Sequence, residues 1–330
     1  MEHHTPRQQR IGPRPATGSK PRRAAVRLRT LIAAACAAVL AVALAAGIFS
    51  AAEARTTTTA APGASAASPA ASAAAGGSAS PSAGPAASAP ASAAAAGSVD
   101  AALDAKIQAI IDANSQYQIG VALIDVSSGA DPADVHEYGV REQFVAASTA
   151  KVLAAAAYYH LVETGAASLD DPLGDYTAGF QLREMIQQSD NDSWSLIMDA
   201  VGHEELTEYA ASLGVTYDPE TNTLTPAEMA GILSGVYSGT LLNAEDTAQL
   251  LSYMQDTNYE TLIPAAVPDG ITVFHKYGLL DDELHDAGIL TKDGTAYALV
   301  IYTKGQSLSD VPERTEVIHQ LTQAVTGALF

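Results

Sequence analysis

The chain has 330 residues, and its 37 Asp and Glu against 17 Lys and Arg give a formal net charge of −20. This acidity argues against nucleic acid as a partner, because binding to phosphates requires the opposite sign of charge. The single cysteine, Cys36, excludes an internal disulfide, and the eight histidines lack metal-binding spacing, so we expect no metal and no other cofactor.

The N-terminal part of the chain has the pattern of an export and membrane segment. Residues 1–30 carry eight Lys and Arg against one acid, Glu2, and are expected to form a basic cytoplasmic tail. Residues 31–50 are apolar, and about 19 residues in a helix span roughly 28 Å, the thickness of a bilayer core. We favour an uncleaved signal anchor because the basic region is long. The alternative is a signal peptide cleaved after Ala54, which would give a secreted protein.

A flexible stalk and one globular domain are expected to follow outside the cell. Residues 51–97 are almost entirely Ala, Ser, Pro, Gly and Thr, which bury too little apolar area to offset the entropy of ordering. Residues 98–330 have the length of one domain, expected to be monomeric, with eight Lys and Arg and 35 Asp and Glu, a formal charge of −27. We interpret this charge as favouring solubility, with a preference for positively charged substrates as the alternative.

The domain is expected to begin and end with strands and helices and to be helical in the middle. An amphipathic helix follows Ser98, strands are expected at 117–125 and 135–140, and a helix from Ser148 ends before Gly165. The later elements are helical pieces over 180–213, helices from Thr225 and over 244–255, strands at 271–276, 287–290 and 296–302, and a helix at 311–329.

This order of elements predicts an α+β fold. Strands from the two ends of the domain can join in one antiparallel five-stranded sheet, with the first and last helices covering one face. The middle helices then form a separate all-helical lobe. We expect a functional site in the cleft between the lobe and the sheet, because sites commonly form at such a boundary.

Ser148-Thr149-Ala150-Lys151 is the most informative stretch of the sequence. A serine in the first turn of a helix lies near free backbone N–H groups, and a lysine three residues later lies on the same face. If burial keeps the amine neutral, Lys151 can take the proton of the Ser148 hydroxyl and produce a nucleophile. A structural alternative is that the serine only caps the helix.

Two further motifs follow in an informative order. Ser189-Asp190-Asn191 comes about 40 residues after Ser148, and Lys276-Tyr277-Gly278 comes about 85 residues further on. With S-x-x-K, this layout resembles that of class A β-lactamases and the related penicillin-binding D,D-peptidases. The resemblance covers most of residues 98–330, including the stretches 225–233 and 285–289.

The resemblance and the chemistry of the residues together suggest roles. Ser148 is the expected acylated nucleophile, and Lys151 the group that takes its proton. Ser189 bridges the lysine and the leaving nitrogen. Asn191 is expected to contact Lys151 and the substrate carbonyl, whereas Lys276 supplies positive charge that depresses the pKa of Lys151 and attracts a substrate carboxylate.

Further residues complete the expected binding site. Asp190 is expected to hold its loop through backbone N–H groups, and Gly278 lets the backbone approach a ligand closely. By resemblance, the N–H groups of Ser148 and Leu279 form the oxyanion hole.

The sequence departs from the family pattern at two places. Tyr277 replaces the usual Thr or Ser, which puts recognition of a substrate carboxylate in doubt. The E-x-x-L-N pattern, whose glutamate activates the deacylating water, is absent, and Glu220 is the nearest candidate for a deacylation base.

The sequence therefore predicts an exported serine acyl hydrolase that forms an acyl-enzyme with β-lactams or related amides, with slow deacylation. A D,D-peptidase or esterase acting on cell-wall peptides is one alternative. A surface binding domain that kept the fold without the chemistry is another.

Overall fold

The computed structural model describes residues 99–127 and 134–330. The predicted basic tail, membrane segment and stalk at 1–97 lie outside the described residues, as does Ser98. In the described part of the chain, no helix is both long enough and apolar enough to cross a membrane.

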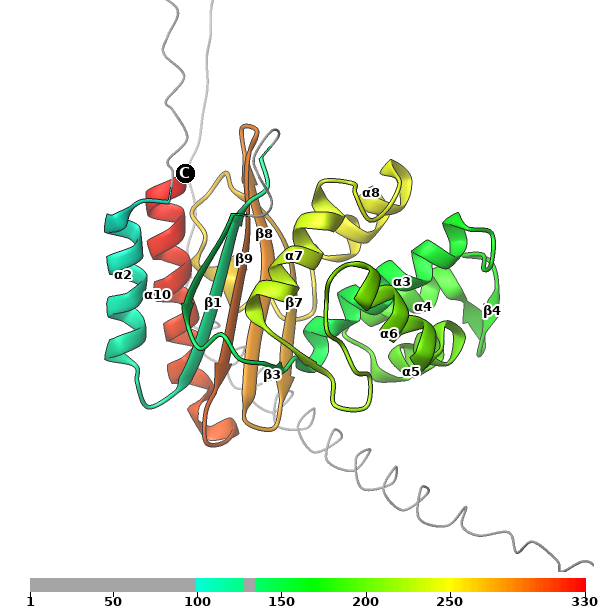
Figure 1. Cartoon of the computed structure of the whole chain (residues 1–330), viewed down its shortest axis with the longest axis horizontal. Helices are drawn as coiled ribbons and strands as arrows, with labels where there is room; N and C mark the ends of the chain where they lie inside the picture. The colour runs from blue at the N-terminus through cyan, green and yellow to red at the C-terminus, as the bar shows by residue number, and fades with distance from the viewer. Residues whose placement is uncertain (1–98, 128–133) are drawn as a thin grey trace, which may run out of the picture. The chain divides into compact units, whose positions relative to one another are not determined.

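An antiparallel five-stranded sheet lies at the centre of the domain, in the order β2-β1-β9-β8-β7 (Figure 1). The two N-terminal strands pair with each other, and β1 also pairs with β9 near the C-terminus. The predicted union of strands from both ends in one sheet is therefore confirmed. The strands are β1 (Gln118–Asp125), β2 (Val135–Gly139), β7 (Thr272–Leu280), β8 (Glu283–Lys292) and β9 (Thr295–Lys304).

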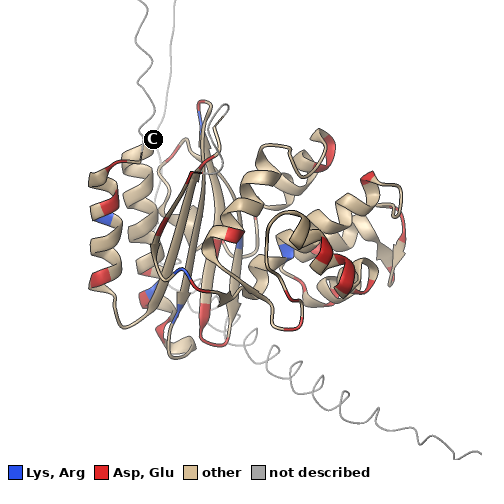
Figure 2. Cartoon of the chain, viewed as in Figure 1, with Lys and Arg blue, Asp and Glu red and all other residues tan. Residues whose placement is uncertain are grey.

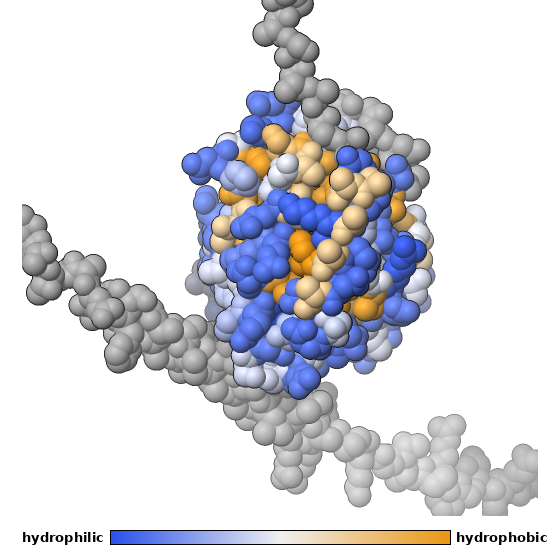
Figure 3. Space-filling view, turned by 90° about the vertical axis from the view of Figure 1, so that its left-hand side faces the viewer, coloured by the Kyte–Doolittle hydropathy of each residue, from blue (hydrophilic) through white to orange (hydrophobic). Residues whose placement is uncertain are grey.

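The first and last helices of the domain, α2 (Ala101–Ala113) and α10 (Val311–Leu329), pack side by side on one face of the sheet, as predicted (Figure 1). Between them and the sheet lies an apolar core that includes Ile107, Leu299 and Leu321. The outward side of this layer is mostly hydrophilic, with apolar residues in separate patches (Figure 3). The side chain of Asp100 caps α2, accepting hydrogen bonds from the N–H groups of its first turn.

Helices cover the other face of the sheet and continue into the helical lobe (Figure 1). Helix α3 (Lys151–Glu163) is buried from Lys151 to Tyr159, as expected for a helix with apolar residues on every side. Helix α7 (Pro226–Tyr237) packs against β1, β8 and β9 and begins with a capping box between Thr225 and Glu228. The other helices on this side are α4 (Ala178–Gln187), α5 (Asn191–Val201), α6 (His203–Ser212) and α8 (Ala244–Tyr253), whereas the short α9 (Ile263–Ala266) packs against α10.

The main differences from the predicted elements lie in the strands. Strand β8 is ten residues long, because the polar residues His285 and Asp286 continue it although the sequence suggested only 287–290. Short pairs were not predicted at all: β3 (Phe144–Val145) pairs with β6 (Thr223–Leu224), and β4 (Pro172–Leu173) pairs with β5 (Tyr176–Thr177). The β3–β6 pair places the segment before α7 beside the segment that leads to Ser148.

Acidic residues greatly outnumber basic residues in the domain. Acidic residues are spread over the helices and loops of both layers, with few lysines and arginines among them (Figure 2). Two of the lysines, Lys151 and Lys276, are buried. They belong to the site described next.

Candidate active site

Ser148 lies in a 3-10 turn, Ala147–Ala150, that runs directly into helix α3. The predicted position at the start of this helix is therefore confirmed, although the first turn is tighter than an α-helix. Ala147, just before the serine, has a φ of 49°, which is uncommon for a residue with a side chain. Ser148 is half-buried, whereas Ala147 and Thr149 are buried, so the turn exposes the serine more than its neighbours.

Hydrogen bonds on both sides fix this turn. The backbone N–H of Ala146 donates to the carbonyl of Asn222 over 2.8 Å, and Nδ2 of Asn222 donates to the carbonyl of Ala147 over 3.1 Å. The hydroxyl of Thr149 is 2.7 Å from the carbonyl oxygen of Ala146 and 2.6 Å from the hydroxyl of Tyr302. The position of Ser148 is thus set by the fold before any substrate arrives.

Lys151 is buried, with 3% of its surface exposed. Its Nζ donates to the carbonyl of Ser189 over 2.7 Å and to Oδ1 of Asn191 over 2.8 Å, and it is 3.3 Å from Oγ of Ser189. In a 3-10 turn, side chains three residues apart eclipse one another, so Ser148 and Lys151 project toward the same side. The structure therefore brings the first and second sequence motifs into one cluster.

The Ser189-Asp190-Asn191 segment is a sharp turn between helices α4 and α5. Ser189 has a φ of 53°, and the N–H of Asp190 donates to the carbonyl of Glu184 over 3.1 Å. Oδ1 of Asp190 accepts a hydrogen bond from the N–H of Ser193 over 2.7 Å and caps α5. The prediction that Asp190 holds the loop through a backbone N–H is confirmed.

Lys276, on strand β7, is completely buried and reaches the same serine. Its Nζ donates to Oγ of Ser189 and to the carbonyl of Tyr277, each over 2.9 Å. Burial lowers the pKa of Lys276 well below its ordinary value, the positive charge of Lys151 lowers it further, and Asp286 partly opposes this shift. Because the repulsion between the two ammonium groups is mutual, the pair loses a proton more readily than an isolated lysine would.

The hydroxyl of Ser189 accepts from both lysines. A hydroxyl has two acceptor positions and one proton to donate. Since Lys151 and Lys276 occupy the acceptor side, the Ser189 proton is directed away from both of them. This arrangement suits a group that passes a proton to another atom.

Strand β7 passes directly beside the serine turn. A Cβ at Gly278 would lie 3.1 Å from the Ala147 side chain and 3.2 Å from the backbone nitrogen of Ser148, so only glycine fits without displacement. The N–H of His275 donates to the carbonyl of Met254, on the side away from β8. Because N–H groups alternate along a strand, the N–H of Leu279 points toward the same free edge.

Tyr277 extends away from the Ser148 turn toward another loop. Its hydroxyl donates to Oδ1 of Asn258 over 3.0 Å, its ring lies 4.8 Å from the ring of Tyr259, and the ammonium of Lys276 lies 4.0 Å from its ring centre. Burial raises the pKa of the Tyr277 phenol, although hydrogen bonds with Ser189 and Asn258 oppose the rise. The phenol therefore stays neutral at physiological pH.

Two buried histidines, His275 on β7 and His285 on β8, were not predicted as part of the site. Nε2 of His285 donates to the carbonyl of Val145 over 2.9 Å, its Nδ1 accepts from the N–H of Thr303, and burial lowers its pKa to about 4. Burial also opposes charge on His275, but Asp286 and Glu260 outweigh it and raise the pKa to about 9. One imidazole is thus neutral and the other charged.

Glu220 does not have the surroundings expected of a buried general base. Its side chain is 82% exposed, and its Oε1 lies 3.5 Å from Nδ1 of His203 at the start of α6. The neighbouring residue that turns toward the nucleophile is Asn222, through its amide. No sequence motif marks Asn222, and only its position two residues after Glu220 could have suggested it.

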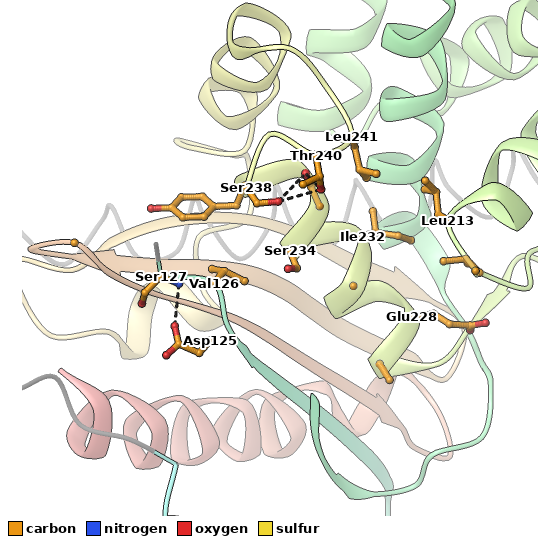
Figure 4. Close-up of a pocket in the computed structure, with 17 residues that line it drawn as sticks. Asp125, Val126, Ser127, Leu213, Glu228, Ile232, Ser234, Ser238, Thr240 and Leu241 are labelled. Carbon is orange, nitrogen blue, oxygen red and sulfur yellow. Dashed lines mark hydrogen bonds between the residues drawn. The ribbon is translucent and has the colours of Figure 1, made fainter. Parts of the chain in front are cut away.

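A cavity of about 960 Å³ lies elsewhere, between α7, the end of β1 and the end of α6 (Figure 4). Its two acidic side chains are occupied by backbone N–H groups: Asp125 accepts from Ser127, and Glu228 accepts from Thr216 and Thr225. The cavity includes no member of the Ser148 cluster, and its acidic groups are used within the fold. In residues 99–127 and 134–330, no group of three or more His, Cys, Asp or Glu is arranged to hold a metal.

Comparison with known proteins gives a consistent family. The model of the "Beta-lactamase enzyme family" matches residues 102–329. A beta-lactamase of Proteus vulgaris is 28% identical over 254 residues, which is 66% of this chain and 92% of that protein. Beta-lactamase CTX-M-8 of Citrobacter amalonaticus is 25% identical and is covered over 86% of its length.

Solved structures show the same fold. The structure of PBP-A has a TM-score of 0.63 and 25% identity, over 69% of this chain and 96% of that one, and a mutant of PBP-A is known as an acyl-enzyme complex with penicillin G. A variant of an ancestral class A beta-lactamase of Gram-negative bacteria has a TM-score of 0.60 and 24% identity, over 68% of this chain and 97% of that one. The predicted α+β fold is confirmed.

Proposed function

This chain belongs to the beta-lactamase enzyme family, and on that basis we propose that it is a serine hydrolase in which Ser148 is acylated by β-lactams or related amides. One observation carries the proposal. Lys151 and Lys276, from two different parts of the sequence, both donate to the hydroxyl of Ser189 beside the Ser148 turn. Placing two lysines in a buried site is unfavourable for stability, so a chemical role explains it better than a structural one.

The acylation step follows from these contacts. Oγ of Ser148 attacks the carbonyl carbon, and its proton passes to the neutral amine of Lys151. The N–H groups of Ser148 and Leu279 stabilise the negative charge that develops on the carbonyl oxygen. Support for this oxyanion hole comes from Gly278, which allows β7 to approach the serine turn.

Collapse of the intermediate breaks the carbon–nitrogen bond. The leaving nitrogen takes a proton from the hydroxyl of Ser189, which is replaced from one of the two lysines that donate to it. Asn191, whose amide oxygen accepts from Lys151, keeps the amine in place and leaves its own Nδ2 for the substrate. The product is an ester at Ser148.

Release of this ester is proposed to be slow. Lys151, Ser189 and Lys276 form hydrogen bonds with hydroxyl, amide and carbonyl oxygens, and the E-x-x-L-N pattern is absent. Glu220 faces His203 at the surface, which does not favour it as the base that activates water. Slow release is also consistent with the similarity to PBP-A, for which an acyl-enzyme complex with penicillin G of a mutant is known.

A D,D-peptidase or esterase acting on cell-wall peptides is the second candidate, and the same similarity to PBP-A favours it. The comparison that separates the candidates is steady-state turnover of penicillins, D-Ala-D-Ala peptides and simple esters by the same preparation. Faster turnover of the peptides or esters supports the second candidate. A domain that only binds gives no serine adduct with any of these compounds.

The location of the protein is part of the proposal. The basic tail at 1–30, the apolar segment at 31–50 and the stalk at 51–97 favour a domain held outside the cell by a signal anchor. Sequencing the N-terminus of the protein isolated both from membranes and from the medium tests this. A mature protein that begins at Arg55 would instead indicate a cleaved signal peptide.

A further inference from the structure

The loop that contains Asn258 connects strand β7 to the turn that carries Ser189 through hydrogen bonds. The backbone N–H of Asn258 donates to the carbonyl of Gln187 over 3.1 Å, and its Nδ2 donates to the carbonyl of Gln188 over 2.8 Å. Its Oδ1 accepts from the hydroxyl of Tyr277 over 3.0 Å. All three polar groups that Asn258 offers on this side are used, so it holds the phenol of Tyr277 beside the residues that precede Ser189.

The same phenol ring covers the charge of Lys276. When Lys276 is protonated, its three hydrogen-bond donors meet Oγ of Ser189, the carbonyl of Tyr277 and the face of the Tyr277 ring. The lysine has no exposed surface. A substrate carboxylate could therefore reach it only by displacing the tyrosine.

Among the described residues of the site, no other cation is accessible to an anionic ligand. Lys151 is buried and donates to the carbonyl of Ser189 and the amide of Asn191. The histidine opposite Gly278 in the sheet, His285, is buried and neutral. The charged His275 is buried, and its two ring nitrogens are bonded to Asp286 and Glu260. Residues 98–330 as a whole contain 35 acidic against eight basic residues, and this net charge adds repulsion toward any anionic ligand.

We propose that Tyr277, held in place by Asn258, is a specificity-determining residue, and that the site prefers acyl donors whose group beside Lys276 is uncharged. Such donors are esters and internal amides, as opposed to compounds that carry a carboxylate next to the reacting bond. This inference rests on the proposed acylation of Ser148 and specifies its substrate class.

Penicillin G and its methyl ester are a matched pair for the test, because they share the reacting amide and differ only by a methyl group that removes the charge beside it. The rate of adduct formation on Ser148 is followed by intact mass spectrometry for each compound. For the wild type we expect the methyl ester to react about tenfold faster than the acid, after correction for their reactivity toward a simple alcohol. In Tyr277→Thr the preference should disappear or reverse, because the ring no longer covers Lys276.

Asn258→Ala is an independent variant that keeps the ring and removes its anchor. It should reduce the preference even if Tyr277→Thr folds poorly. Tyr176→Thr, at a tyrosine 58% exposed in the helical lobe, is the matched control and should leave the preference unchanged. Circular dichroism of each variant checks that the fold is kept.

Salt separates a local effect from the charge of the whole domain. At 1 M salt the screening length falls to about 3 Å, so repulsion from distant acids is lost while the covering of Lys276 by Tyr277 remains. A preference that persists at 1 M salt supports the inference. Equal or faster reaction of the acid with the wild type would overturn it, as would a preference that vanishes in salt or survives in both variants. Reaction of neither compound with Ser148 would reject the proposed function itself, and the inference with it.

Discussion

The side-chain amide of Asn222 donates a hydrogen bond to the carbonyl oxygen of Ala147, with 3.1 Å between the two atoms. Both residues have a positive φ, 51° for Asn222 and 49° for Ala147. Two uncommon backbone conformations thus support each other directly before the nucleophile. This contact links the loop that replaces the expected glutamate loop to the position of Ser148.

Removing the Asn222 side chain is therefore expected to slow acylation. Asn222→Gly keeps the positive φ and removes the amide, and we expect the acylation rate to fall about tenfold because the serine turn loosens. Asn222→Ala should cost in addition about 1 kcal/mol of stability, since alanine disfavours this backbone conformation. Single-turnover acylation and urea unfolding measure the two effects separately. Unchanged acylation in both variants would show that the turn does not depend on Asn222.

Gly278→Ala is expected to impair acylation strongly, by about a hundredfold or more. The new methyl group would lie 3.1–3.2 Å from the Ala147 side chain and the Ser148 nitrogen, and it would separate the two N–H groups of the proposed oxyanion hole. Gly327→Ala in helix α10 is the control, because a Cβ there meets no atom within 4 Å. It should keep full acylation and gain up to about 1 kcal/mol of stability. Equal acylation by the two variants would argue against close approach of β7.

The lowered pKa of Lys276 predicts a pH-dependent stability. Below its ordinary value of 10.5, the unfolded chain binds a proton at this lysine that the native state gives up at lower pH. The wild type therefore gains stability as the pH rises toward 10.5. Lys276→Met lacks this dependence, so its unfolding free energy relative to the wild type should fall between pH 7 and pH 10.5. Urea unfolding at both pH values measures the difference, and parallel pH profiles would contradict the shift.

The raised pKa of His275, about 9, predicts the opposite dependence. Asp286 and Glu260 favour the charged imidazole, which adds stability that is fully present below about pH 6.5 and is lost as the pH rises through about 9. At about 1.4 kcal/mol per pKa unit, the contribution is on the order of 3 kcal/mol. His275→Gln should therefore be more destabilising at pH 6 than at pH 10. A constant effect across this range would show that the histidine is neutral in the native state.

The sequence was sufficient for the architecture and for the motifs that form the site. Period-two and helical patterns predicted the strands and helices at both ends, and the capping sequence at Thr225 predicted the start of α7. The three motifs converge because two of them precede helices and the third lies on the strand that passes beside the Ser148 turn. Ser148 precedes α3, Ser189 precedes α5, and Lys276 lies on the edge strand.

The supporting contacts could not be predicted, for reasons specific to each. Asn222 and Asn258 act through single amide groups on loops, and no periodicity or motif marks them. Buried polar residues such as His285 interrupt the apolar pattern of a strand, so the sequence underestimated β8. The hydrogen-bond partner of the Tyr277 phenol depends on how separate parts of the chain meet in space. The spacing of residues along the sequence does not predict this.

Acylation of Ser148 is the central claim, and its most direct test is a time course of a labelled penicillin with adduct mapping by peptide mass spectrometry. The account predicts one label per chain on the peptide that contains Ser148, with an ester that decays much more slowly than it forms. Ser148→Ala should carry no label, and Lys151→Ala should acquire it at least about a hundredfold more slowly. A wild-type protein that remains unlabelled after prolonged exposure to excess penicillin, without hydrolysing it, would contradict the claim.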